Sequence, residues 1–262
     1  MTGDGYQAAI LDVDGTIVRG NALLPGAVDG LATLEEVGVS RLLFSNNPTR
    51  GAAHYGEKLA AHGIDVAPED VLTSATVTAA YLAENHAGER IYLVGEDRLR
   101  RILEDAGLSV TTEPTAAEVV VGSIDRDLEF DTLSDALTAL EREVPFYGTD
   151  PDVTIPTDDG SIPGSGAILA AMEAMGGRQV DAILGKPSAV AAAAAMARLE
   201  APPSETLVVG DRLDTDILLG ADAGMDTAVV LTGVTTRATV EDGDVTPDYV
   251  LESLGDVGDL LS

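Results

Sequence analysis

Short apolar runs alternate with helical stretches along this chain, and this alternation limits its fold more than any other feature. Runs typical of strands cover residues 8–13, 41–47, 205–211 and 226–233. Stretches typical of helices cover residues 26–37, 50–62 and 215–224. Strands that alternate with helices build a parallel sheet with helices on both faces. The predicted fold class is therefore α/β, with a doubly wound parallel sheet.

The middle of the chain has strands and helices of its own. Residues 90–95, 118–123 and 144–150 are typical of strands, and residues 97–106 and 132–142 of helices. This set lies between two segments of the main sheet, so we expect an inserted smaller α/β domain over residues 78–181. Residues 1–77 and 182–262 would then form a discontinuous core. By its position, the insertion would act as a lid over the crevice of that core.

The chain is strongly acidic, with 45 acidic and 15 basic residues and a formal net charge of −30. Such a surface repels nucleic acid and anionic membranes, so we expect neither as a partner. The acidity could serve a basic partner, or it could keep the protein soluble in a salt-rich cytoplasm. The acids are spread along the whole chain, and Lys58 and Lys186 are its only lysines beside many arginines. Both features favour a halophilic protein.

Several classes of protein are excluded by what the sequence lacks. It has no cysteine, which excludes disulfides and thiolate metal sites. Residues 1–20 lack the pattern of a secretory signal, and no apolar run approaches the ~20 residues of a membrane span. We therefore expect a cytoplasmic protein.

The first strand ends at two aspartates, in the stretch "AAILDVDGT". Asp12 and Asp14 would repel each other, and a divalent cation with oxygen ligands, such as Mg²⁺, relieves this conflict. Asp12 could then attack a phosphorus atom and form an aspartyl-phosphate. Asp14 could protonate the leaving oxygen and later take a proton from water. The alternative is a turn that is merely rich in Asp and Gly.

Two further segments have groups suited to a phosphoryl group. Ser45 ends the second strand, and Asn46 and Asn47 follow it in "FSNNPTR". A hydroxyl followed by backbone amides can hydrogen-bond phosphoryl oxygens, although a polar turn before proline is the alternative. In "ILGKPSAV", Lys186 supplies a compact point charge that could hold a phosphate beside a carboxylate. A surface lysine is the alternative there.

The fourth segment is "VVGDRLDTDILLG", where Asp211 ends an apolar strand. Asp211 could supply another oxygen to the metal. Asp216 could bind the metal directly or orient a water bound to it. For Asp214 we expect a helix-capping role. Ligands of such sheets bind beyond the carboxyl ends of the strands, so Asp12, Ser45 and Asp211 could meet at one crevice.

These four segments, in this order, resemble the motifs of the haloacid dehalogenase (HAD) superfamily. "SNNPTR", the insertion, and "YGTDPDVTIPTDDGSIPGSGAI" sharpen the likeness to the NagD-like branch with a type-IIA cap. That branch includes p-nitrophenyl, pyridoxal, and phosphoglycolate or glycerol phosphatases. The resemblance covers almost the whole chain and implies a Rossmann-like core with a cap. It also implies a phosphatase that acts on a small phosphorylated metabolite, and a homodimer formed through the cap.

By this resemblance, the metal ligands are Asp12, Asp211 and the backbone carbonyl of Asp14, with Asp216 in support. Asp12 would be the nucleophile and Asp14 the general acid and base. Ser45, Asn46, Asn47 and Lys186 would hold the phosphoryl group. The cofactor of the protein would be Mg²⁺. Lys58→Arg is expected to be silent.

One position departs from the branch, which usually has asparagine where this chain has Asp150. Asp150 lies in the stretch 148–152, our candidate for a substrate contact, so the departure weakens any transfer of a substrate by analogy. Three alternatives to hydrolysis remain: phosphoryl transfer by a phosphotransferase or mutase, halide displacement, and non-catalytic sensing of a phosphometabolite. Asp14 argues against halide displacement, which needs neither a metal nor an acid.

Overall fold

The computed structural model describes residues 5–157 and 160–261, which form two compact units. The first unit contains the described chain up to Ser45, Ala52–Leu72 and the described chain from Ala191. The second contains Asn46–Gly51 and Thr73–Val190. The expected limits of the inserted domain, residues 78 and 181, both lie inside the second unit.

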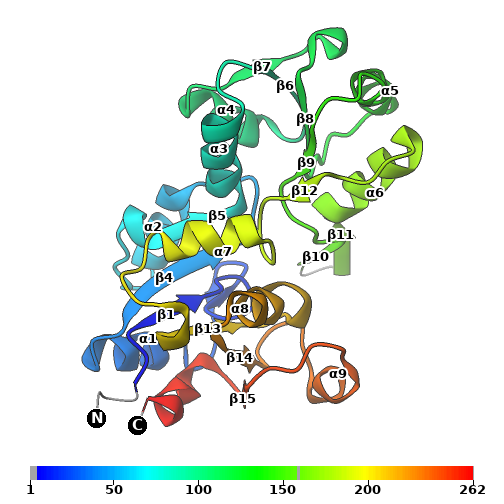
Figure 1. Ribbon diagram of the computed structural model, residues 1–262. Coiled ribbons are helices and arrows are strands. Elements are labelled where there is room, and N and C mark those ends of the chain that lie inside the picture. The colour runs from blue at the N-terminus through cyan, green and yellow to red at the C-terminus, as the bar shows by residue number, and fades with distance from the viewer. Residues whose placement is uncertain (1–4, 158–159, 262) are drawn as a thin grey trace. The chain divides into compact units, whose positions relative to one another are not determined.

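The first unit is built on a six-stranded sheet in the order β15-β14-β13-β1-β4-β5 (Figure 1). Its strands are β1 (Ala8–Leu11), β4 (Ser40–Ser45), β5 (Val71–Thr73), β13 (Thr206–Gly210), β14 (Asp226–Val230) and β15 (Tyr249–Leu251). β1 pairs in parallel with both neighbours, and Ala8 lies opposite Ser40 on β4 and Thr206 on β13. All of β1 is buried, as expected for a central strand that is covered on both faces.

Helices cover both faces of this sheet. They are α1 (Ala27–Glu36), α2 (Ala52–Ala60) and α8 (Leu218–Ala223), whereas α9 (Arg237–Asp242) has no buried residue. On one face, Leu34 of α1 and Leu59 of α2 share a core with Leu11 of β1. On the other face, Gly220 of α8 packs so closely that an added Cβ would lie 3.0 Å from the side chain of Val208. The alternating pattern of the sequence therefore predicted this doubly wound arrangement correctly.

The second unit contains a five-stranded sheet in the order β12-β9-β8-β6-β7. Its strands are β6 (Arg90–Val94), β7 (Ser109–Thr111), β8 (Val119–Gly122), β9 (Phe146–Gly148) and β12 (Ala182–Ile183). Each neighbouring pair is parallel. β10 (Thr154–Thr157) and β11 (Gly160–Pro163) pair antiparallel in a separate two-stranded sheet.

Helices pack on both faces of this second sheet as well. They are α3 (Ser74–Asn85), α4 (Asp97–Asp105), α5 (Phe130–Leu140) and α6 (Ser165–Gly176). α3 and α4 share one apolar core with the face of the sheet that includes Leu93 and Val121. α5 and α6 share another with the opposite face, which includes Val94 and Val120. Alternation along β6 and β8 thus supplies both cores.

The chain forms another helix after β12. α7 (Ala189–Met196) begins in the second unit and continues in the first. Across residues 5–157 and 160–261, no helix combines the length and the apolar composition needed to cross a membrane.

Candidate active site

Two aspartates follow neighbouring strands at the carboxyl edge of the six-stranded sheet. Asp12 comes directly after β1, and Asp211 directly after β13. Leu11 lies opposite Val209, and the Asp12 amide donates a hydrogen bond to the Val209 carbonyl at 2.8 Å. Because parallel neighbours end at the same edge, the side chains that follow them converge.

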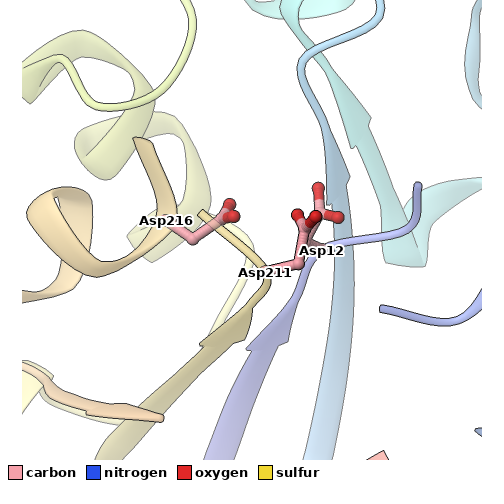
Figure 2. Close-up of side chains that lie close together, drawn as sticks. All are labelled: Asp12, Asp211 and Asp216. Carbon is pink, nitrogen blue, oxygen red and sulfur yellow. The ribbon is translucent and has the colours of Figure 1, made fainter. Parts of the chain in front are cut away.

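Asp12, Asp211 and Asp216 form one buried acidic group. Each offers a carboxylate oxygen, and these oxygens all lie within 4.8 Å of one another. The three residues are only 7%, 1% and 1% exposed. Figure 2 shows the carboxylate of Asp216 pointing toward those of Asp12 and Asp211, which extend from the ends of β1 and β13. Three negative charges at this spacing repel one another strongly away from water.

Two glycines allow the backbone to come close to Asp211. A Cβ atom at Gly15 would lie 2.3 Å from Asp211 Oδ2, and one at Gly233 would lie only 1.8 Å from it. Gly15 also has a φ angle of 109°, which side chains rarely allow. The Val234 amide donates to Asp211 Oδ2 at 2.7 Å. The loop after β14 therefore holds this carboxylate in place.

A π-helical turn, Leu213–Ile217, brings Asp216 to the group and leads into α8. The Arg212 amide donates to Asp216 Oδ2 at 3.2 Å. The capping role predicted for Asp214 is wrong. Its exposed carboxylate instead accepts two hydrogen bonds from the Arg212 guanidinium, at 3.1 Å and 2.9 Å.

The buried acidic group fits a cation of the Mg²⁺ type. All its donors are carboxylate oxygens, the hard ligands that Mg²⁺ prefers in proteins. A divalent charge would also offset the repulsion among Asp12, Asp211 and Asp216. These three residues would hold the ion.

Asp14 has a different set of partners. The hydroxyl of Tyr55 donates to Asp14 Oδ2 at 3.1 Å, and the ammonium of Lys58 donates to Oδ1 at 3.2 Å. Ser45 Oγ, at the end of β4, lies 3.3 Å from the same Oδ2 and 2.7 Å from the Tyr55 hydroxyl. We call these four residues the Asp14 cluster.

Sequence reasoning missed the two residues of this cluster that lie on α2. Tyr55 was not considered, and the one expectation for Lys58 was that Lys58→Arg would be silent. Their spacing of three residues places both on one face of a helix, but nothing local indicates that Asp14 meets that face. The rarity of lysine in the chain was the one available signal.

Tyr55 is buried beneath the Asp14 carboxylate, with only 1% of its surface exposed. Burial, together with the negative charges of Asp14 and Asp12, raises the pKa of Tyr55 well above its ordinary value. The phenol therefore keeps its proton at neutral pH and can donate it in a hydrogen bond to Asp14.

Asn46 and Lys186, both expected to bind phosphate, are joined by two hydrogen bonds in the second unit. Asn46 Nδ2 donates to the Lys186 carbonyl at 3.0 Å, and the Lys186 amide donates to Asn46 Oδ1 at 2.9 Å. The lysine side chain is buried. Asn47 has other partners: its Oδ1 accepts hydrogen bonds from the Thr49 amide at 2.9 Å and from the Thr49 hydroxyl at 3.0 Å. Asn46 thus fixes the backbone that carries Lys186.

Asp150 is buried inside the second unit, with 2% of its surface exposed. Its Oδ2 accepts hydrogen bonds from Ser165 Oγ at 2.6 Å and from Thr149 Oγ1 at 2.9 Å. The Asp152 amide lies 3.3 Å from its Oδ1. Burial, reinforced by the negative charge of Asp152, raises the pKa of Asp150 to about 7, despite the hydrogen bonds that favour its charged form.

Comparison with known proteins places this geometry in a family. A model described as "Haloacid dehalogenase-like hydrolase" matches residues 9–109, and a second HAD-hydrolase-like model matches residues 183–257. An acid sugar phosphatase from Staphylococcus epidermidis is 35% identical over 249 residues, which cover 95% of each chain. The chain belongs to the haloacid dehalogenase-like hydrolases. The two matched segments contain all the predicted catalytic, phosphate-binding and metal-binding residues of this HAD protein, but not the stretch 148–152.

Solved structures agree with this assignment. A p-nitrophenyl phosphatase from Archaeoglobus fulgidus is 34% identical, with a TM-score of 0.92 over 97% of this chain and 99% of that one. NagD from E. coli K-12 is 30% identical, with a TM-score of 0.86 over 96% and 98%. The predicted NagD-like HAD fold is therefore confirmed. The predicted enzyme class, a phosphatase, agrees with the names of these relatives.

Proposed function

We propose that this HAD phosphatase hydrolyses monoesters of small phosphorylated metabolites, with Mg²⁺, through an aspartyl-phosphate on Asp12. One observation carries the proposal: the oxygens of Asp12, Asp211 and Asp216 converge within 4.8 Å in a buried group. Such a group can offset the charge of a phosphate only if a cation binds there. Because a relative is named an acid sugar phosphatase, sugar phosphates are the first substrates to test.

In the first half-reaction, a carboxylate oxygen of Asp12 attacks phosphorus and the bond to the ester oxygen breaks. Asp14 gives its proton to that oxygen, so the leaving group departs as an alcohol. In the second, Asp14 takes a proton from water while the water oxygen attacks the same phosphorus. The bond to Asp12 breaks, which restores its carboxylate and releases inorganic phosphate.

Charge neutralisation supplies much of the catalysis, because the transition state of phosphoryl transfer is loose. Asp12, Asp211 and the Asp14 carbonyl, supported by Asp216, would hold Mg²⁺, which lowers the charge that opposes attack on the phosphate. Ser45, Asn46, Asn47 and Lys186 remain the proposed partners of the phosphoryl oxygens. Residues 1–77 and 182–262 are proposed as the catalytic core and residues 78–181 as the cap, and a homodimer through the cap is part of the same proposal.

The proposal is tested by measuring phosphate release from a panel of monoesters in molar KCl, with Mg²⁺ or with EDTA. We expect release with Mg²⁺ alone. Asp12→Asn should abolish turnover and also the trapping of beryllium fluoride, while the circular dichroism spectrum stays unchanged. Asp214→Asn, which changes a nearby aspartate that pairs with Arg212, should retain full activity. More than a tenth of wild-type activity in Asp12→Asn would exclude it as the nucleophile.

A further inference from the structure

The Asp14 carboxylate has a hydrogen-bond donor on each of its oxygens. The Tyr55 hydroxyl donates to Oδ2, and the Lys58 ammonium donates to Oδ1. Both bonds are of ordinary length, 3.1 Å and 3.2 Å. A carboxylate held at both oxygens cannot turn about its Cβ–Cγ bond without breaking at least one contact. The pair therefore fixes the direction in which Asp14 presents its oxygens.

α2 presents both donors from a rigid position. Tyr55 and Lys58 lie three residues apart and so share one face of the helix. The ring of Tyr55 belongs to the apolar core of the first unit, alongside Leu59 and Leu11. The Lys58 ammonium lies 5.6 Å from the centroid of the Tyr55 ring, within range of a cation–π contact, and only 13% of the lysine side chain is exposed.

Simpler roles account for only part of this arrangement. Tyr55 could be just a core aromatic, and Lys58 could be just a positive charge in the last turn of α2, where it favours the helix dipole. A core role needs the ring of Tyr55 but not its hydroxyl. A dipole role needs the charge of Lys58 but not its contact with a residue 44 positions earlier in the chain.

We propose that Tyr55 and Lys58 are positioning residues that hold the Asp14 side chain in the orientation from which its protonated form gives a proton to the leaving oxygen. This inference rests on the proposed phosphatase mechanism. An alkoxide is a poor leaving group and needs a well-placed acid, whereas p-nitrophenolate departs with little help from one. Loss of positioning should therefore slow the hydrolysis of alkyl phosphates selectively.

The test compares Tyr55→Phe and Lys58→Met with wild type on two substrates, glycerol phosphate and p-nitrophenyl phosphate. Each variant removes one hydrogen bond to Asp14, so we expect kcat/KM for glycerol phosphate to fall about tenfold. For p-nitrophenyl phosphate we expect Lys58→Met to change kcat/KM by less than about twofold, and Tyr55→Phe, which also removes the 2.7 Å contact with Ser45 Oγ, to lower it less than it lowers that for glycerol phosphate. Lys58→Arg keeps a charged donor and should recover most of the activity that Lys58→Met loses.

Two matched controls remove similar contacts elsewhere in the first unit. Tyr6→Phe deletes a hydrogen bond from a tyrosine hydroxyl to Asp226, and Arg41→Met deletes an ion pair with Glu35. Neither contact involves Asp14. We expect both controls to leave the ratio of the two kcat/KM values unchanged.

Crystal structures of the metal-free wild type and of Tyr55→Phe provide a second readout. We expect the Asp14 carboxylate to turn away from its wild-type orientation in the variant. An unchanged orientation, or equal slowing of both substrates by Tyr55→Phe and Lys58→Met, would overturn the inference. If instead the wild type released no phosphate from any ester, the proposed function would fail, and the crystal structures would still decide whether Tyr55 orients Asp14.

Discussion

Replacing Asp150 with asparagine should change how the stability of the protein depends on pH. The pKa of Asp150 is about 7 in the folded protein, against an ordinary value of 3.8, because the carboxyl is buried. The folded state therefore binds the proton more tightly than the unfolded state does. This group stabilises the fold fully below its unfolded pKa and loses that contribution as pH rises through the folded pKa.

The size of the effect follows from the shift. Between the two pKa values, each pH unit costs about 1.4 kcal/mol of unfolding free energy, so the full loss is about 4 kcal/mol. Of this, about 2 kcal/mol is lost between pH 5 and pH 7, and about 3 kcal/mol between pH 5 and pH 8.5. Asparagine does not ionise, so Asp150→Asn should gain about 3 kcal/mol relative to wild type when pH rises from about 5 to about 8.5.

Urea denaturation of both proteins at these two pH values, in the same concentration of KCl, measures the gain. The quantity to compare is the change in unfolding free energy between the two pH values. The unfolding free energy at a single pH is less informative, because the NH₂ group of asparagine can lie near the Asp152 amide, which contacts Oδ1 of Asp150, at every pH. Asp105→Asn, at an exposed carboxylate on α4, serves as control and should show no such gain. A wild-type-to-variant difference that stays constant across pH would refute the account of a buried, neutral Asp150.

Three further predictions concern the acidic group, the lysine and the surface. Gly233→Ala should displace the Asp211 carboxylate and weaken Mg²⁺ binding, measured by calorimetry, about 10- to 100-fold. The control Gly5→Ala, whose added Cβ would have no atom within contact distance, should bind Mg²⁺ normally, and equal affinities of the two variants would contradict the close approach of Gly233 to Asp211. Lys186→Arg should lower kcat/KM at least about tenfold, because the planar guanidinium of arginine does not replace the compact charge of a buried lysine ammonium. Full activity of Lys186→Arg would contradict this explanation. Thermal scans in about 0.1 M and 1 M KCl should show a higher melting temperature at high salt, which screens the net charge of −30, whereas no rise would argue against a halophilic surface.

The sequence was most informative where the chemistry lies at the end of a strand. Asp12 and Asp211 each follow a buried apolar run, and the parallel pairing of β1 with β13 brings them together. The rule that parallel strands end at a common edge was enough to predict this meeting. Strands β1, β4, β13 and β14 and helices α1, α2 and α8 were predicted because their apolar patterns are local.

The sequence was least informative where a contact depends on side-chain direction across the fold. Lys58 occupies the last turn of α2, where lysine is common, yet its ammonium donates a hydrogen bond to Asp14. Asp214 has the place of a helix cap, but the Arg212 guanidinium draws its carboxylate away. The helix α3 (Ser74–Asn85) was missed because its first half is rich in threonine and valine, which favour strands.

The pairing of β1 with β13 has a consequence for the newly made chain on the ribosome. β1 is complete at Leu11, but its partner begins only at Thr206, after the whole second unit has been synthesised. At translation rates of about 5–20 residues per second, β1 waits roughly 10 to 40 seconds for that neighbour. During this interval one edge of an apolar strand lies open, and an unpaired strand edge can pair with another chain.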